Sequence, residues 1–293
     1  CGSKDEGSSS ADKTEASSDD AAASDATYEG TIKIGVVGPF SGSSAMVGDT
    51  EKKGVELAAK QINENGGING MTIELIEEDD QQDPKTAVSA INKLVSSDEV
   101  VAAVGTVNSS CTLAMMDVTE NNEIPLVTPI SSGVAITDPS NSYIVRLQAS
   151  DKLQAKAITE YAINDLGYKN IAVMFQNDDF GAGGKDVVVE TLKDAGIEPL
   201  AVEAFDSSAT DMSAQLLKIK DLNPEAIIMW TMYGCGATIA KQCDQLGIDC
   251  DLMGGGGLTN AKLYELGGES AVGILNTQTF FPDKEKASET AGA

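Results

Sequence analysis

Histidine is absent from the chain, and its absence removes several kinds of chemistry at once. Without an imidazole there is no Ser-His-Asp or Cys-His nucleophile and no His-ligated zinc. A general base would have to be Asp, Glu, Lys, Tyr or Cys. Because no paired acid and base stand out, the sequence predicts a protein that is not an enzyme and that needs no metal or cofactor.

Basic residues are scarce, since 20 Lys and Arg face 46 Asp and Glu and leave a formal net charge of −26. Binding to nucleic acid or to an anionic membrane surface depends on clustered Lys and Arg. No apolar run approaches the roughly 18 residues of a membrane-spanning helix. We therefore expect no nucleic-acid partner and no membrane span.

The first 30 residues have a composition of their own. Residues 2–30 hold eight acidic and two basic residues among mostly Ser and Ala. Such a segment cannot bury enough apolar surface to offset the entropy of ordering it, which predicts a disordered tether. Cys1 followed by Gly, Ser and this tether resembles a bacterial lipoprotein, in which the N-terminal thiol carries the lipid anchor. The alternative is an arbitrary chain start that happens to be cysteine.

From residue 31 onward, short apolar runs alternate with amphipathic segments. The apolar runs predict strands at 31–38, 71–76, 100–104, 124–127, 170–175, 198–204, 225–231, 250–253 and 272–277. The segments between them predict helices at 48–65, from Pro84 onward, and at 109–121, 151–166, 183–195, 210–220 and 236–246. This alternation is typical of βαβ units with a parallel sheet covered on both faces. At about 150 residues a domain, the length predicts two doubly wound α/β lobes.

Several motifs resemble one known family. Residues 35–95 open with GVVGPFSG, and VGTVNSSCT, IPLVTPISS, DDFGAGG, MYGCG, LMGGGG and GGESAVG follow in order. Together they resemble the type I periplasmic binding proteins, specifically the leucine/isoleucine/valine-binding group of ABC importers. The resemblance implies two lobes joined by three crossovers, with a ligand in the cleft between them. The cleft would close around a small molecule and present it to a membrane permease.

The resemblance also sets expectations for organisation. We expect a first lobe at 31–148, a second at 149–253 and an incomplete return to the first lobe at 254–293. The family's closing helices lie beyond this sequence, so apolar surface on the first lobe should be exposed. The family implies an extracytoplasmic monomer with an ABC permease as its partner. The lipoprotein-like start adds a lipid anchor at Cys1, on the outer face of the cell membrane, and the alternative is a periplasmic location.

Five site residues follow from the first-lobe motifs. Ser109 falls on the family's serine that meets a ligand carboxylate, at a helix N-terminus that is receptive to an anion, and Ser110 lies beside it. Ile130 falls where a backbone carbonyl meets an ammonium, and Ser131 and Ser132 fall on a ligand-binding hydroxyl segment. Without the resemblance, Asn108 or Ser109 is an ordinary helix N-cap and ISSG an ordinary turn.

Three further site residues follow from the second-lobe motifs. Phe180 falls on an aromatic residue of the cleft wall, and Tyr233 on a tyrosine that reaches the ligand. Gly256 stands where branched-chain amino acid binders carry the Glu that pairs with the ligand ammonium. Either another acid, such as Asp178 or Asp179, replaces that Glu, or the ligand lacks an ammonium.

Other positions leave alternatives open. Val47 stands where a tyrosine often lines the pocket, which suggests a larger or less polar pocket. Cys243 and Cys250 flank a tight turn, so they are either a disulfide or two buried free thiols. The acidic run at 77–80 lacks metal-binding spacing and is typical of a solvated loop.

The favoured function is therefore a binding lipoprotein for a branched-chain or related amino acid or small carboxylate. The alternatives are a sensory ligand-binding domain, or a binder of an aromatic acid, an amide or urea.

Overall fold

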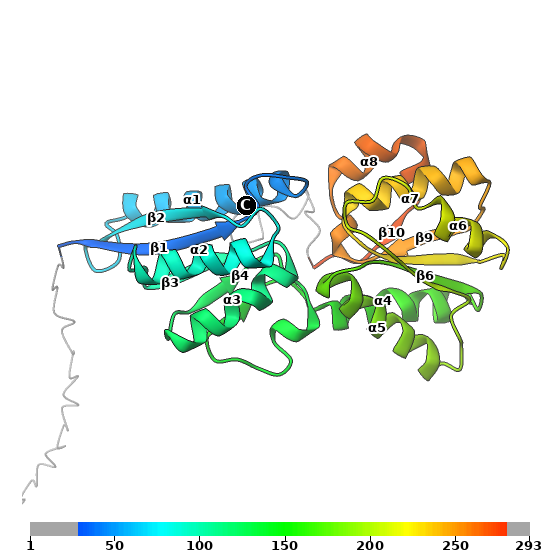
Figure 1. The fold of residues 1–293 in the computed structure, drawn as a ribbon, viewed down its shortest axis with the longest axis horizontal. Coiled ribbons are helices and arrows are strands. Elements are labelled where there is room, and N and C mark those ends of the chain that lie inside the picture. Colours follow the sequence, from blue (N-terminus) through cyan, green and yellow to red (C-terminus); the bar gives the residue numbers. More distant parts are fainter. Residues whose placement is uncertain (1–28, 280–293) are drawn as a thin grey trace, which may run out of the picture.

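The structure is a computed structural model that describes residues 29–279, and Figure 1 shows its two α/β lobes side by side. Each lobe is built on a five-stranded parallel sheet. The strand order is β2-β1-β3-β4-β5 in the first sheet and β10-β9-β8-β6-β7 in the second. The predicted fold class, two doubly wound lobes, is confirmed.

The first lobe contains the elements β1 (Thr31–Gly38), α1 (Ala45–Glu64), β2 (Thr72–Asp79), α2 (Pro84–Ser96), β3 (Ala102–Gly105), α3 (Ser109–Asn121), β4 (Leu126–Thr128) and β5 (Ile144–Arg146). The second contains α4 (Asp151–Glu160), β6 (Ile171–Gln176), α5 (Asp179–Asp194), β7 (Val202–Phe205), α6 (Ser213–Lys220), β8 (Ala226–Trp230), α7 (Tyr233–Leu246), β9 (Asp251–Gly254), α8 (Ala261–Gly267) and β10 (Leu275–Asn276).

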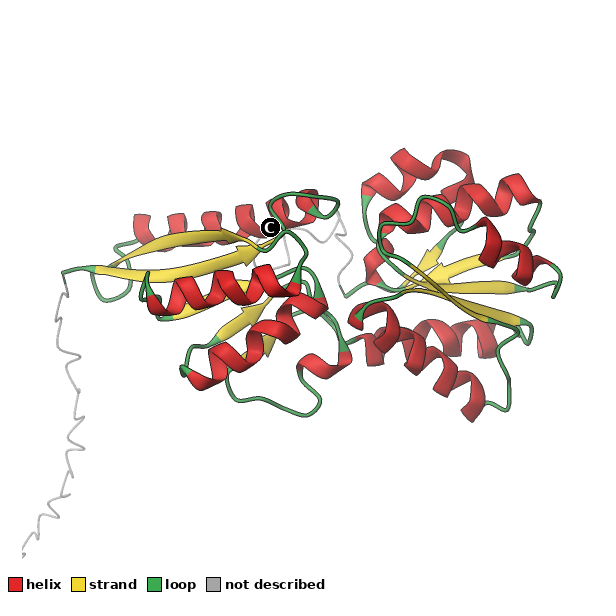
Figure 2. Ribbon diagram, viewed as in Figure 1, coloured by secondary structure: helices red, strands yellow, loops and turns green. Residues whose placement is uncertain are grey.

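Helices cover both faces of each sheet (Figure 2). In the first lobe, α2 and α3 bury Ile91, Leu94 and Met115 against one face, and α1 lies on the other. In the second lobe, α4 and α5 pack on one face while α6, α7 and α8 pack on the opposite one. Every residue of strand β8 is buried, because helices cover both faces of its sheet. A strand buried on both faces is apolar throughout, and for this reason continuous apolar runs predicted the strands correctly.

The segment after β9 differs from its predicted place. It was expected to return to the first lobe, but β10 pairs in parallel with β9 in the second sheet. Helix α8 packs on α7 and buries Leu263 in the second-lobe core. The prediction is therefore wrong for residues 254–276. The two-residue strand β10 is too short for its sequence to show which strand it pairs with, and tertiary packing decides the pairing. Residues 280–293 lie outside the described residues.

Apolar surface is exposed on the first lobe, as predicted. Register places Val36, Val104, Val127 and Val145 in one row on the face that α1 covers. Val36 is 1% exposed under α1, whereas Val145 on the edge strand β5 is 53% exposed. Within residues 29–279, the helical cover of this face thus ends between the first and the last strand of the row.

The acidic run at 77–80 does not form the solvated loop that the sequence predicted. Its first three residues end strand β2, and Asp80 is fully buried. The Asp80 carboxylate accepts hydrogen bonds from the Thr106 hydroxyl and the Gln82 backbone N–H. These donors offset part of the desolvation that burial imposes.

The strands of both sheets are parallel, so their carboxyl ends lie at one edge of each sheet. The chain crosses between the lobes at 147–150, and residue Thr279 runs beside this crossover, where its hydroxyl donates to Gln148 Oε1 at 2.7 Å. Among the described residues, no helix is both long and apolar enough to cross a membrane.

Candidate functional site

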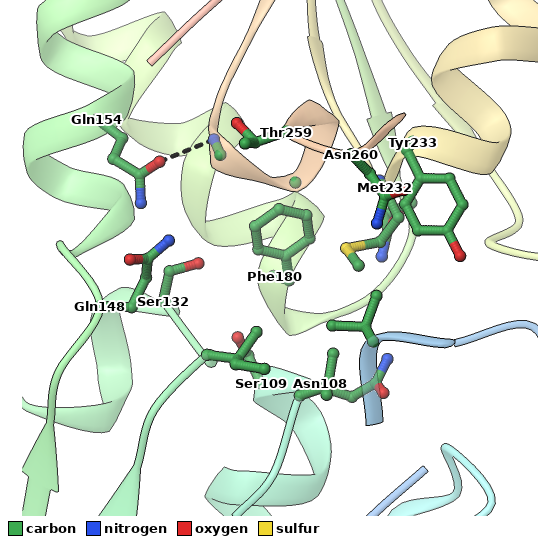
Figure 3. Close-up of a pocket in the computed structure, with 16 residues that line it drawn as sticks. Asn108, Ser109, Ser132, Gln148, Gln154, Phe180, Met232, Tyr233, Thr259 and Asn260 are labelled. Atoms are coloured by element: carbon green, nitrogen blue, oxygen red, sulfur yellow. Dashed lines mark hydrogen bonds between the residues drawn. The ribbon is translucent and has the colours of Figure 1, made fainter. Parts of the chain in front are cut away.

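A cavity of about 210 Å³ lies between the two lobes at the carboxyl ends of their strands. Figure 3 shows its walls, with Asn108 and Ser109 from the first lobe facing Phe180, Met232 and Tyr233 from the second. The residues that line it are Val47, Val107, Asn108, Ser109, Ile130, Ser132, Gln148, Gln154, Gln176, Phe180, Met232, Tyr233, Gly256, Gly257, Thr259 and Asn260.

The N-terminus of α3 forms the floor on the first-lobe side. Asn108 is its N-cap residue, but its side chain makes no capping hydrogen bond, and its Oδ1 atom is buried without a partner among the described residues. Ser109 is 2% exposed, and its Oγ accepts a hydrogen bond from Gly133 N at 3.1 Å. The first-turn N–H groups have no helical acceptor, which makes this end of α3 receptive to an anion.

The second-lobe wall is largely aromatic. Phe180 lies in the first turn of α5 and packs at a tilt on Trp230, with ring centroids 6.2 Å apart. Tyr233 begins α7, is 8% exposed, and its hydroxyl donates to Ser43 O across the interlobe gap at 3.5 Å. These contacts position two large apolar surfaces opposite α3.

Glutamine amides hold the loop after β9. Gln154 Oε1 accepts a 2.8 Å hydrogen bond from Gly256 N, drawn as the dashed line in Figure 3, and its Nε2 donates to Ala149 O at 2.6 Å. The same Oε1 atom accepts from Thr277 Oγ1 at 3.3 Å. Gln154 therefore clamps the glycine loop to the interlobe crossover.

Six of the eight predicted ligand-binding residues meet at this cavity: Ser109, Ile130, Ser132, Phe180, Tyr233 and Gly256. Val47, singled out as a departure, lines it as well. Their binding role remains a prediction.

The other two predicted site residues lie elsewhere. Ser131 is 1% exposed and turns inward, where its hydroxyl lies 2.6 Å from Thr112 Oγ1 and donates to Thr106 O at 2.7 Å. Ser110 faces an adjoining crevice, where its Oγ accepts from Asp179 N at 3.3 Å. Adjacent residues on a helix or turn point in different directions, so each predicted pair has one member in the cavity.

Sequence reasoning missed the amide side chains of the wall. Gln148, Gln154 and Gln176 come from the crossover, α4 and the end of β6, and Thr259 and Asn260 follow the glycine loop. An isolated glutamine has no spacing signature. The one usable signal was Gln176, a polar residue at the end of an otherwise apolar strand.

The acids proposed to replace a cleft glutamate do not line the cavity. Asp178 is the N-cap of α5, where its Oδ1 accepts from Gly181 N at 2.8 Å and its Oδ2 from Gln176 Nε2 at 2.5 Å. Burial raises the pKa of Asp178, and these two donors oppose the shift. Asp179 is exposed.

The cysteines that the sequence left open are free thiols. Cys243 and Cys250 both lack a disulfide, and burial raises the pKa of their thiols to about 12 and about 11. Within the described residues, no three His, Cys, Asp or Glu side chains gather as they would around a metal ion. Cys1, the predicted lipid attachment site, lies outside the described residues.

Two α/β lobes with an uncharged cavity between their strand ends define a bilobal ligand-binding protein. The sequence model described as "Periplasmic binding protein" matches residues 31–292. The chain belongs to this family, among the type I proteins related to Leu/Ile/Val-binding proteins.

Three relatives illustrate the similarity. A Leu/Ile/Val-binding protein homolog 3 from Brucella melitensis is 30% identical over 260 residues, which cover 89% of this chain and 70% of the relative. The leucine-binding protein LivK from Thermotoga maritima has a TM-score of 0.80 at 28% identity, covering 86% of this chain and 71% of that one. The LivJ protein from Streptococcus pneumoniae in complex with isoleucine has a TM-score of 0.77 at 29% identity, covering 88% and 75%.

Proposed function

We propose that this protein is the extracytoplasmic substrate-binding component of an ABC importer, which holds a branched-chain or related amino acid or another small carboxylate between its lobes. The observation that carries the proposal is the cavity itself, because residues from both lobes line it at the strand ends. In open parallel sheets this is the edge at which ligands bind.

The carboxylate of the ligand sits at the N-terminus of α3. The unpaired first-turn N–H groups, the Ser109 hydroxyl and the helix dipole together favour a negative charge there. Ser132 lines the same side of the cavity and supplies a second hydroxyl donor. The apolar part of the ligand then packs on Phe180 and Met232 from the opposite lobe.

The cavity size supports a small ligand. About 210 Å³ lies below the roughly 300–1,000 Å³ of sites for drug-sized molecules. A ligand that contacts both walls stabilises the closed arrangement of the lobes, because it binds that arrangement better than the open one. We expect the ligand to be bound without being turned over. The residues that line the cavity include no nucleophile next to a general base.

Membrane attachment through Cys1 is part of the proposal. Its support is the sequence that follows, a Gly-Ser start and an acidic, Ser- and Ala-rich segment up to residue 30. An acyl chain anchors by burying CH₂ groups at about 0.8 kcal/mol each, and the acidic segment keeps the lobes clear of an anionic surface. A monomer so tethered presents its cleft to the permease.

Thermal-shift screening tests the ligand. The full chain is melted with amino acids, aromatic acids, other small carboxylates, amides and urea. A true ligand at 100 times its Kd adds about 2.7 kcal/mol of stability, which raises the melting temperature by roughly 5–10 °C. If no compound in the panel raises the melting temperature, the proposed binding function is wrong.

A further inference from the structure

The cavity between the lobes is uncharged. Its apolar side chains come from Val47, Val107, Ile130, Phe180 and Met232, and its polar ones are amides and hydroxyls. Among the described residues, no Asp, Glu, Lys or Arg lines it. A ligand ammonium in this space would lose its water without gaining a counter-charge, which is strongly unfavourable.

No nearby carboxyl group lines the cavity to supply that counter-charge. Asp178 lies in the adjoining crevice, where its oxygens accept hydrogen bonds from Gly181 N and Gln176 Nε2. Asp151 is fully buried outside the cavity lining, and neither of its carboxyl oxygens has a partner among the described residues. Burial raises the pKa of Asp151 to about 7, which reduces the charge it carries at neutral pH.

Several side chains of the wall keep a free donor although their oxygen already accepts a hydrogen bond. Asn260 Oδ1 accepts from Lys262 N at 2.9 Å and Thr259 Oγ1 from Asn276 Nδ2 at 2.8 Å, whereas the Asn260 amide N–H and the Thr259 O–H have no acceptor among the described residues. Ser109 Oγ accepts from Gly133 N, and its O–H is likewise free. These groups call for an acceptor on the ligand.

Of the three glutamines, Gln148 adds a free donor. Gln148 Oε1 accepts from Thr279 Oγ1 at 2.7 Å, so its Nε2 is the free end. Gln154 and Gln176 are each bonded at both ends of their amides. Among the side chains that line the cavity, the buried acceptor without a partner is Asn108 Oδ1, a neutral atom that cannot replace a counter-charge.

We infer that the ligand is a small carboxylate without an ammonium group, whose other polar atoms accept hydrogen bonds, as in a 2-oxo acid. The inference rests on the proposed function and narrows its substrate class. The carboxylate meets the N-terminus of α3, the oxo group meets the free donors, and an aliphatic or aromatic side chain packs on Phe180 and Met232.

Calorimetry with a matched pair tests the inference. Leucine and 4-methyl-2-oxopentanoate share their carboxylate and side chain and differ at C2, which carries an ammonium and a hydrogen in leucine and an oxo group in the other. Phenylalanine and phenylpyruvate form a second pair. We expect each oxo acid to bind at least tenfold more tightly than its amino acid. Equal or tighter binding of the amino acid overturns the inference and leaves the proposed function standing. If no compound of the two pairs and the wider ligand screen binds, the proposed function itself fails.

A substitution at Gly256 should reverse the preference for the oxo acid over the amino acid. A Cβ built there would lie 2.8 Å from Gln154 Oε1 and 3.3 Å from Gln148 Nε2, so a side chain must displace the end of the Gln154 amide that clamps this loop. Gly256→Glu places a carboxylate in the cavity and should improve leucine relative to the oxo acid by at least tenfold. Gly256→Gln, of equal size and no charge, should keep the oxo acid ahead. Identical preferences in the two variants would contradict the electrostatic argument, and the wild-type comparison stands even if both fold poorly.

Discussion

Ser109 Oγ accepts a 3.1 Å hydrogen bond from Gly133 N, which joins the first residue of α3 to the segment that follows β4. The two backbones lie so close that a Cβ on Gly133 would be 2.9 Å from Ser109 Cβ. This contact fixes two strand exits of the first lobe relative to each other. Because this part of the site is already ordered, ligand binding has a smaller entropic cost to overcome.

Ser109→Ala should weaken ligand binding by about 0.5–1.5 kcal/mol, the net value of one hydrogen bond. The backbone N–H groups of α3 remain, so binding should be reduced rather than lost. Ser109→Asp should weaken it further, because its carboxylate would face that of the ligand. Calorimetry with the best compound of the ligand screen measures both effects.

Ser110→Ala is the matched control for Ser109. Ser110 precedes Cys111 on the same helical turn, but it faces the adjoining crevice rather than the cavity. Its substitution should change the affinity less than threefold. Unchanged binding in both Ser109 variants, or an equal loss in Ser110→Ala, would contradict the assignment of the carboxylate to this end of α3.

Two neighbouring glycines of α5 should respond oppositely to alanine. A Cβ on Gly184 would lie 2.1 Å from Trp230 Nε1, whereas a Cβ on Gly183 has its nearest neighbour at 3.9 Å. Gly184→Ala should therefore destabilise the fold by about 1–3 kcal/mol through overpacking. Gly183→Ala should be neutral or stabilise it by up to about 1 kcal/mol through helix propensity. Urea denaturation measures both, and equal effects would refute close packing of α5 on the indole.

The same glycines explain part of what the sequence left unpredicted. Because glycine disfavours helix formation, the sequence DDFGAGG predicted a helix that begins only at residue 183. In the structure α5 begins at Asp179. Asp178 caps the N-terminus of α5. The helix approaches Trp230 so closely that only glycine, which has no side chain, fits at position 184. Packing against the sheet outweighed local propensity.

Regular elements were predicted best where burial and capping agree. The helix at 109–121 matches α3 at both ends, and Pro84 begins α2 with Asp83 as its cap. The three-residue strand β5 and the helix α8 were missed, because neither is long enough to show a period. Family motifs located the cavity, but not the direction in which each neighbouring serine points.

Cys1→Ser should release the protein from the membrane if the anchor is attached there. We expect mass spectrometry of the native protein to find a lipid on Cys1, and cell fractionation to move the variant into the soluble fraction. Cys250→Ser, which changes another cysteine, should leave the distribution unchanged. Membrane retention of Cys1→Ser would remove the lipoprotein proposal without affecting the ligand site.

Glu51 on α1 should make the fold less stable as the pH rises. It is 5% exposed, neither carboxylate oxygen has a partner among the described residues, and burial together with nearby Asp80 raises its pKa from 4.5 to about 8. The folded state keeps this proton up to about pH 8, whereas the unfolded chain releases it near pH 4.5. Unfolding therefore releases a proton in between, and stability falls across that window by up to about 4–5 kcal/mol.

Glu51→Gln isolates this effect, because the amide has nearly the same shape and does not titrate. Urea denaturation at pH 5, 6, 7 and 8 should give a smaller loss of stability with pH in the variant than in the wild type. Some pH dependence should remain, since burial also raises the pKa of Asp151, to about 7. Glu56→Gln, exposed on the same helix, should keep the wild-type slope. If Glu51→Gln keeps that slope as well, then the Glu51 carboxyl is ionised in the folded protein and α1 packs less tightly over β1 than the structure has it.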